Sequence, residues 1–296
     1  MLEQKLSGTP CRTGPRRMAD VGVRQFDGIT EVSANVDGFR LRFRVPDACE
    51  VSRAGDPFLA CALLPAMATG GQLVVEPGLP VSAGLLRNTS TLQEIFHAWN
   101  PRLRIIPASA TSPPAQVLNA GGMSLFCGGV DSTYTLLKNV ATIDRAVYMR
   151  GFDFGPEDTG LVAAVQRNAE VVRTFGMELL PVETNHYAFG NRYGVSRNHT
   201  QGSILGALAL LLRFQTAYVP ASVTYDQAMR LGQCRSALAP VTVSCAPRIP
   251  RSSRTSRRRT APRRFRVPRP SQVGRRLPSV RTLRWMQPTA GRRHVT

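Results

Sequence analysis

The first third of the chain alternates apolar and polar residues in the manner of β-strands. Between residues 29 and 45 nearly every second residue is apolar, and Asp37-Gly38 interrupts the alternation. An Asp-Gly pair between two alternating segments is a strong hairpin signal, because these residues suit a tight turn. Residues 58–67 are almost continuously apolar and predict a short buried helix. A strand at residues 72–76 and a helix at about residues 90–99 are expected to follow.

From residue 121 onward, short apolar segments alternate with longer segments of helical periodicity. Short buried strands that are separated by helices indicate a parallel sheet covered on both faces. Residues 199–214 are apolar nearly all round, which is typical of a helix packed deep within a fold. Strands are expected at residues 123–127, 146–149, 178–182 and 217–220, and helices at residues 132–139, 159–175 and 199–214.

The predicted fold class is α/β, a doubly wound parallel sheet that is incomplete at its C-terminal end and preceded by a small α+β domain. The periodic pattern ends after Met229, where Pro, Ser and Arg become dominant. The expected organisation is a disordered N-terminus at residues 1–24, the α+β domain at 25–106, a linker at 107–120, the α/β domain at 121–229 and a disordered tail at 230–296.

The formal net charge of +19 is concentrated in that tail. Residues 231–296 contain 17 Arg but no Lys and no acidic residue, which leaves 21 basic against 19 acidic residues in the rest of the chain. One interpretation is an arm that binds nucleic acid non-specifically through phosphate neutralisation. The other is a frameshift near Arg230, because a GC-rich gene read in the wrong frame yields this Arg, Pro, Ser and Ala bias. Both interpretations stay open.

Apolar segments and cysteines exclude several classes of protein. The longest apolar stretch, residues 204–212, is shorter than the ~18 residues of a membrane-spanning helix. The first twenty residues lack a continuous apolar region of the secretory type, so a cytoplasmic location is expected. The six cysteines form no Cys-x-x-Cys pair and show no zinc-type spacing, so neither a disulfide framework nor a structural metal site is indicated.

A glycine-containing segment between a predicted strand and a predicted helix is the strongest candidate for chemistry. Its residues are Ser124-Leu125-Phe126-Cys127-Gly128-Gly129-Val130-Asp131-Ser132-Thr133. Two glycines allow a close approach of the backbone to an anion, and the amides at the start of the helix are oriented toward it. The segment therefore predicts a phosphate-binding turn with hydroxyl donors at Ser132 and Thr133, in which Asp131 either holds a magnesium ion or orients the loop.

This segment resembles the loop of the PP-loop ATP pyrophosphatase family, whose pattern is Ser-Gly-Gly-x-Asp-Ser. The chain matches the pattern except that Cys127 stands in place of the first Ser. The resemblance extends to residues 150–153, 182–185 and 218–225, and is greatest to an uncharacterised bacterial group related to asparagine synthetase and 7-cyano-7-deazaguanine synthase. It covers most of residues 25–229, implies a sheet of the HUP/PP-loop type, and ends where the suspected frameshift begins.

The resemblance implies an ATP-dependent, AMP-forming ligase or amidotransferase-like enzyme with a small-molecule substrate. A carboxylate or carbonyl oxygen of the substrate would attack the α-phosphate, and pyrophosphate would leave. Catalytic roles are expected for Asp131 and Ser132, with Asp131 also binding Mg²⁺. The residues expected to bind ATP are Cys127, Gly128, Gly129, Val130, Asp131, Ser132, Thr133, Gly151, Asp153 and His199.

Two alternatives to an active enzyme remain. Cysteine is a weaker hydrogen-bond donor than serine, so Cys127 is compatible with a nucleotide-binding module of impaired catalysis. The arginine-rich tail is compatible with a protein that binds nucleic acid through this tail alone. The sequence identifies neither the acceptor substrate nor the nucleophile, and it gives no indication of the oligomeric state.

Overall fold

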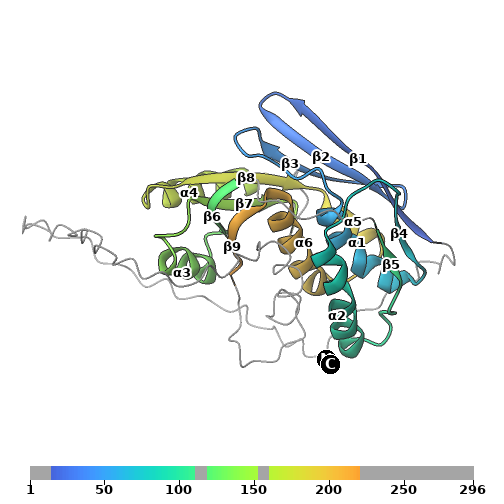
Figure 1. Cartoon of the computed structure of the whole chain (residues 1–296). Coiled ribbons are helices and arrows are strands. Elements are labelled where there is room, and N and C mark those ends of the chain that lie inside the picture. The colour runs from blue at the N-terminus through green and yellow to red at the C-terminus, as the bar shows by residue number, and fades with distance from the viewer. Residues whose placement is uncertain (1–14, 111–118, 153–159, 221–296) are drawn as a thin grey trace, which may run out of the picture. The chain divides into compact units, whose positions relative to one another are not determined.

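The computed structural model describes residues 15–110, 119–152 and 160–220. Within these residues, nine strands form one mixed sheet in the order β5-β4-β1-β2-β3-β8-β7-β6-β9 (Figure 1). The protein therefore has an α/β fold. Its antiparallel half consists of β1, β2 and β3, its parallel half runs from β8 to β9, and β4 and β5 add to β1 in parallel at the far edge of the sheet.

The antiparallel half is a three-stranded meander built on the alternating pattern of the sequence. Side chains of Val32, Leu41 and Phe43 are fully buried, while their neighbours along each strand face the other side of the sheet. The predicted hairpin is confirmed, since Asp37 and Gly38 both adopt positive φ angles, of 52° and 78°. The strands of the meander are β1 (Arg16–Phe26), β2 (Ile29–Val36) and β3 (Phe39–Pro46).

The disorder expected for residues 1–24 is wrong for residues 16–24, which form most of β1. Their weak alternation arises from a register shift between Ala19 and Gly22, which moves side chains from one face of the strand to the other. Strand β1 is held in place by pairing with β2 on one side and with β4 (Leu73–Val75) on the other. Residues 1–14 lie outside the described part of the chain.

Helices α1 (Asp56–Thr69) and α6 (Arg197–Leu212) pack against one another beneath the sheet (Figure 1). Both helices are apolar on all sides, which explains why nearly every residue of α1 is buried. Helix α2 (Ala83–Trp99) packs against α1 and begins earlier than the expected residue 90. It begins at Ala83 because the Ser82 side chain caps it, accepting a hydrogen bond from the Leu85 amide.

The parallel half of the sheet has the strand order β8-β7-β6-β9. The chain runs from β6 to β7 and β8 on one side of β6, and then returns to place β9 on its other side. The strands are β6 (Asn119–Leu125), β7 (Arg145–Arg150), β8 (Glu178–Thr184) and β9 (Phe214–Tyr218), and the helices between them include α3 (Val130–Lys138), α4 (Gly160–Arg173) and α5 (His186–Arg192).

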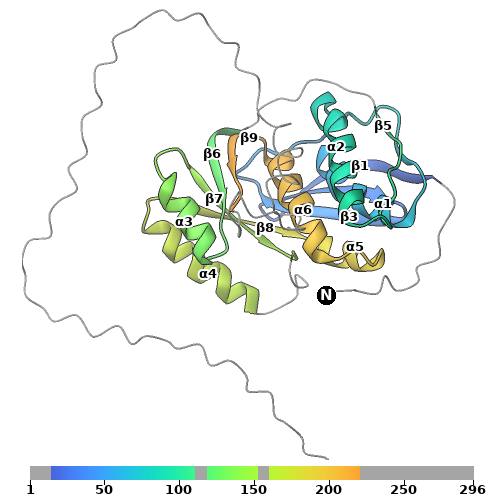
Figure 2. The same ribbon diagram turned by 90° about the horizontal axis from the view of Figure 1, so that it is seen from below.

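Two hydrophobic clusters lie on opposite faces of the parallel strands. Ala146 of β7 belongs to a small cluster with Leu136 of α3 and Val172 of α4. The next residue, Val147, belongs to the large cluster that includes α1 and α6. Helices α3 and α4 therefore cover one face, whereas α1 and α6 cover the other, and Figure 2 shows α3 and α4 on the other side of β7 from α6.

The expected division into two domains joined by a linker at residues 107–120 does not describe this sheet. Strand β5 (Ala108–Ser109) and the beginning of β6 both fall within the expected linker. Strands β3 and β8 pair directly, and residues on both sides of the expected boundary at residue 106 share the large cluster. The tail at residues 230–296 and the frameshift expected near Arg230 lie outside the described residues.

No helix within the described residues is both long and apolar enough to span a membrane.

Candidate functional site

The glycine turn, which we define as residues 127–129, connects the carboxyl end of β6 to helix α3. Strand β6 has β7 on one side and β9 on the other, and the helices that lead to these two strands lie on opposite faces of the sheet. A crevice forms outside the strand ends where connections diverge in this way, and ligands of open α/β sheets commonly bind there.

Gly128 and Gly129 have different reasons to be glycine. Gly128 has a φ of +79°, and a Cβ at this position would lie 2.3 Å from Oδ1 of Asn168 on α4. Gly129 has an ordinary φ of −76°, and the nearest atom to its added Cβ would be Cys127 Sγ at 3.4 Å. Gly128 is therefore required by the fold, whereas Gly129 leaves open the space in front of the helix.

The N-terminus of α3 is exposed. Gly129 is the N-cap residue, and no side chain of the described residues caps this helix. Val130 is 85% exposed, and Asp131 is exposed as well. The first amides of a helix have no partner within the helix, and together they carry a partial positive charge. This end of α3 can therefore donate hydrogen bonds to an anion.

Ser132 and Thr133 stabilise the turn from within. Both hydroxyls donate to the Gly129 carbonyl oxygen, each over 2.9 Å. The Ser132 oxygen also accepts a hydrogen bond from the Cys127 amide, at 3.3 Å, and lies 3.5 Å from Cys127 Sγ. These hydroxyls were expected to donate to phosphate, but here they bond within the turn and fix the orientation of its backbone.

Asp131 is the one acidic residue in the first turn of α3. No group of three or more metal-ligating side chains occurs among the described residues. Magnesium commonly takes only one or two carboxylates and completes its coordination with phosphate oxygens and water. Asp131 fits this pattern only if a bound nucleotide supplies the other ligands.

Gly151 follows the carboxyl end of β7, the parallel neighbour of β6, and so lies at the same edge of the sheet as the glycine turn, whereas His199 belongs to α6. Gly151 lies at the end of β7, where a Cβ would be 1.8 Å from the Thr184 carbonyl oxygen, so close packing alone requires glycine. The His199 ring packs edge-on against Phe96 of α2, with centroids 6.1 Å apart, and its burial lowers the pKa of the imidazole. Asp153 lies outside the described residues.

A cavity of about 670 Å³ lies near the amino end of β9, whereas the glycine turn follows the carboxyl end of β6. Its lining includes a buried ion pair between Asp56 at the start of α1 and Arg213 at the end of α6, with oxygen and nitrogen 3.3 Å apart. Asp56 also accepts hydrogen bonds from Ser82. These contacts join three helices, so the pair serves the fold.

One buried histidine and one group of arginines were not predicted from the sequence. His186, the first residue of α5, is buried, and its Nε2 has no hydrogen-bond partner among the residues that the structure describes. A set of arginines on β3 lies beside Glu31 and Glu183. The alternation of arginine with apolar residues at positions 39–45 was the signal for this set.

No family model, curated protein or solved structure matches the chain. The resemblance to the PP-loop family therefore stays a prediction from the motif, and the glycine turn has to be judged by its own geometry.

Acidification is expected to destabilise the protein through His186. Burial lowers the pKa of the His186 imidazole to about 4, below its ordinary value of 6.5. The unfolded chain therefore binds the proton first, and the stability contributed by neutral His186 is lost as the pH falls from 6.5 toward 4. The free energy of unfolding should decrease by about 3 kcal/mol between pH 7 and pH 4 from this residue alone.

Urea unfolding of the protein and of His186→Gln across this pH range would measure this contribution. The profile of the variant should be flatter than that of the unsubstituted protein. Identical profiles would show that His186 remains neutral in both states or is protonated without cost.

Proposed function

We propose that the glycine turn binds the phosphates of ATP, and that the protein is an AMP-forming, pyrophosphate-releasing ligase or amidotransferase-like enzyme. The observation that supports this most directly is the exposed and uncapped N-terminus of α3, immediately after a glycine whose missing side chain leaves open space. Backbone amides at such a position are well suited to hold a phosphate group.

The topology around the turn supports the same proposal. A parallel strand order of β8-β7-β6-β9, with helices on both faces, is compatible with a doubly wound sheet. In such a sheet the turn after the first strand faces the crevice where the strand order reverses. The glycine turn follows β6, the first parallel strand of this part of the chain.

Each residue of the turn has a role in the proposed reaction. The amides of residues 130–132 hold the pyrophosphate as it leaves, and they stabilise the negative charge that develops on it. Ser132 and Thr133 keep the turn in the required shape through their bonds to Gly129. Asp131 holds Mg²⁺, which would neutralise charge on the phosphate oxygens when bound. The substrate carboxylate or carbonyl oxygen attacks the α-phosphate.

A nucleotide-binding module with impaired catalysis is a second candidate, and the observation that favours it is the position of Cys127. Its Sγ lies 3.5 Å from the Ser132 hydroxyl, at the entrance of the turn. A thiol donates a weaker hydrogen bond than a hydroxyl, so the α-phosphate would be less well stabilised during the reaction. ATP binding without pyrophosphate release, with release gained in Cys127→Ser, would favour this candidate.

Replacement of Gly129 by valine tests the phosphate site without disturbing the fold. The backbone angles of Gly129, −76° and 165°, suit any residue, and its Cβ would have only one neighbour within 4 Å. The valine side chain would occupy the space in front of the helix and displace the phosphate from its amides. ATP affinity in the presence of Mg²⁺, measured by calorimetry, should fall about a hundredfold, because charge-assisted hydrogen bonds are lost.

Gly22→Val is the matched control, because Gly22 lies on β1 far along the sheet and an added Cβ there has no neighbour within 4 Å. Both variants should unfold at nearly the same urea concentration as the unsubstituted protein. Unchanged ATP affinity in Gly129→Val would refute the assignment of the turn as a phosphate site.

A further inference from the structure

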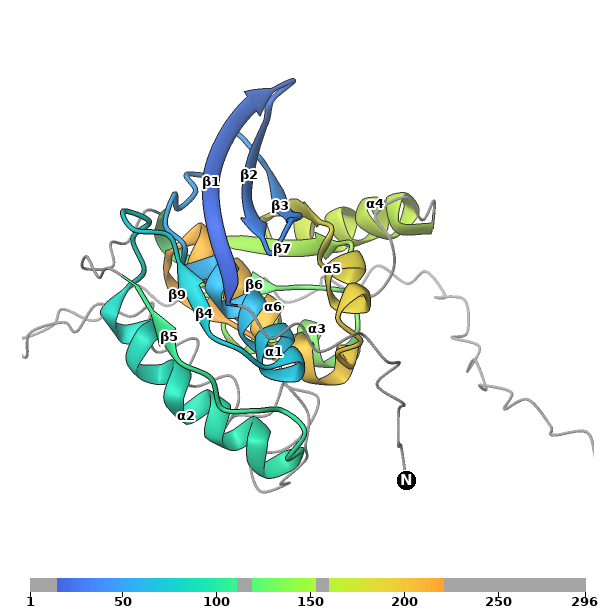
Figure 3. The ribbon, with the colours of Figure 1, turned by 90° about the vertical axis from the view of Figure 1, so that its right-hand side faces the viewer.

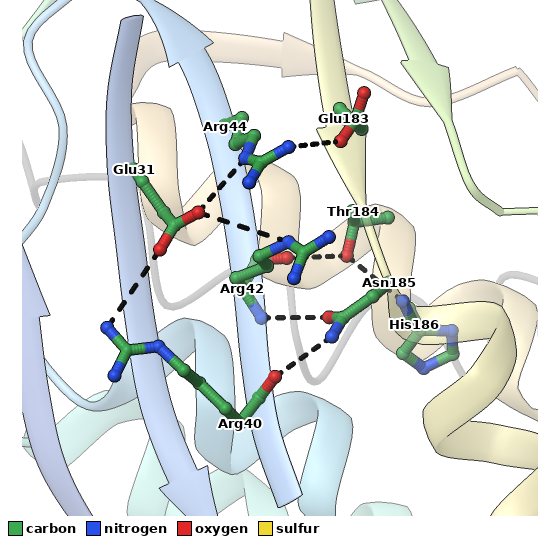
Figure 4. A network of polar contacts seen from close by, with 8 residues as sticks. All are labelled: Glu31, Arg40, Arg42, Arg44, Glu183, Thr184, Asn185 and His186. Atoms are coloured by element: carbon green, nitrogen blue, oxygen red, sulfur yellow. Dashed lines mark hydrogen bonds and ion pairs between the residues drawn. The ribbon is translucent and has the colours of Figure 1, made fainter. Parts of the chain in front are cut away.

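The meander has one face that is not covered by helices α1 and α6, and we call this the arginine face. Apolar side chains such as Phe43 face the helices, so the residues between them face away. In β3 these are Arg40, Arg42 and Arg44 (Figure 4). Figure 3 shows the meander as a curved ribbon that rises away from α1 and α6.

Strand register extends this face across five strands. Arg24 of β1 lies opposite Glu31 of β2, which lies opposite Arg44 of β3. Arg44 lies opposite Glu183 of β8, and Glu183 lies opposite Arg150 of β7. Charge therefore alternates along this row, and the addition of Arg40 and Arg42 gives five arginines against two glutamates.

The arginines differ in how firmly they are paired. Arg44 bridges both acidic residues, at 2.9 Å from Glu31 and 3.0 Å from Glu183. Among the described residues, the ion pairs of Arg40 and Arg42 are to Glu31, each at 3.9 Å, and their side chains are 52% and 33% exposed. Arg44 is thus held within the network, whereas Arg40 and Arg42 share one carboxylate over a long distance. Their guanidinium groups retain donors for an anionic partner.

An exposed aromatic ring lies at one end of this face. Phe26, two residues after Arg24 on β1, is 40% exposed. The Arg44 guanidinium lies 5.8 Å from the centre of the Phe26 ring. An aromatic ring next to a row of arginines is the combination by which proteins hold unpaired bases and phosphates together.

We propose that the arginine face binds single-stranded nucleic acid, with phosphates held by Arg40 and Arg42 and a base stacked on Phe26. Alternate side chains along a strand are about 6.8 Å apart, and five strands span about 19 Å. A basic surface of this extent fits an extended chain of phosphates better than a single small anion. This inference does not depend on ATP binding at the glycine turn, and the tail beyond residue 230 plays no part in it.

The test uses the full-length chain with the 17 arginines of residues 231–296 replaced by glutamine, so that the tail contributes no charge. Binding of a fluorescent oligouridine of about 12 nucleotides is followed by anisotropy over a range of salt concentrations. Arg40→Ala together with Arg42→Ala should weaken binding, and should reduce the slope of log K against log salt by about 1.4, since each phosphate contact contributes about 0.7.

Arg87→Ala together with Arg102→Ala is the control pair, because both residues are exposed and lie on α2 or just after it. This pair removes the same charge and should leave the slope unchanged. Equal effects of the two pairs, or no effect of either, would overturn the proposal. The backbone bonds that join Arg40 and Arg42 to Asn185 do not involve the truncated side chains, so the fold is expected to persist.

Phe26→Ala distinguishes nucleic acid from other polyanions. Loss of base stacking should reduce oligouridine affinity about tenfold but leave heparin affinity unchanged. Ultraviolet cross-linking of oligouridine to the protein with its native arginine face gives a second measurement that needs no substitution there, and the cross-link should map to the peptide that contains Phe26. The proposal would be overturned if Phe26→Ala reduced the affinities for oligouridine and heparin equally, or if the cross-links were confined to other peptides.

Discussion

Replacement of Gly151 by alanine is expected to lower the free energy of unfolding by about 3 kcal/mol or more. The added Cβ would lie 1.8 Å from the Thr184 carbonyl oxygen, which is a backbone atom at the end of the neighbouring strand β8. The φ of +79° would strain any other residue as well. Relief of the contact requires separation of β7 from β8, and these two strands are paired along six residues.

Gly176→Ala is the control for this substitution. Gly176 also has a positive φ, of 72°, but an added Cβ there has no neighbour within 4 Å. It should therefore show only the cost of backbone strain, about 1 kcal/mol. Urea unfolding followed by circular dichroism measures both variants. If the free energy of unfolding fell by a similar amount in both variants, the close packing at Gly151 would have relaxed without cost.

Asp56→Ala is expected to destabilise the protein by about 3–5 kcal/mol, because it leaves the buried Arg213 without its carboxylate. Asp56 is fully buried and lies 3.3 Å from the Arg213 guanidinium. It also accepts hydrogen bonds from the amide and hydroxyl of Ser82, the residue that caps α2. The substitution therefore disturbs the end of α6 and the beginnings of α1 and α2 together.

The double variant Asp56→Ala with Arg213→Met measures how much of this loss comes from the uncompensated charge. Methionine keeps much of the volume of the arginine and removes the buried positive charge. The double variant should be more stable than Asp56→Ala alone, as judged by urea unfolding. A double variant that is less stable than the single one would indicate that the two residues act independently.

Local patterns in the sequence predicted the elements of the fold better than their arrangement. The hairpin around Asp37-Gly38 was predictable because alternation and turn residues are local properties. The pairing of β3 with β8 joins residues about 140 positions apart, and it depends on the Asn185 side chain, which bonds to the backbone of Arg40 and Arg42. No local pattern encodes such a contact, so two domains were expected where one sheet exists.

The functional residues likewise differ in whether the sequence alone could predict them. The glycine turn was predictable, because its residues are contiguous and lie between a strand and a helix. The arginine face was not, because its residues come from β1, β2, β3, β7 and β8 and are brought together only by register. His186 was overlooked because a single histidine carries no pattern, and its burial depends on the packing of α5 against α6 and β3.

The unequal sizes of the two hydrophobic clusters imply that the helices on the two faces of the sheet differ in their free energy of local unfolding. Among the described residues, α3 and α4 are held by the six buried residues of the smaller cluster, whereas α1 and α6 belong to a far larger one. Of the two helical layers that the structure describes, the one that begins at the glycine turn is therefore expected to unfold locally at the lower free energy. A ligand held at the turn would stabilise that layer by mass action, and occupancy would set how often amide protons of α3 and α4 exchange with solvent.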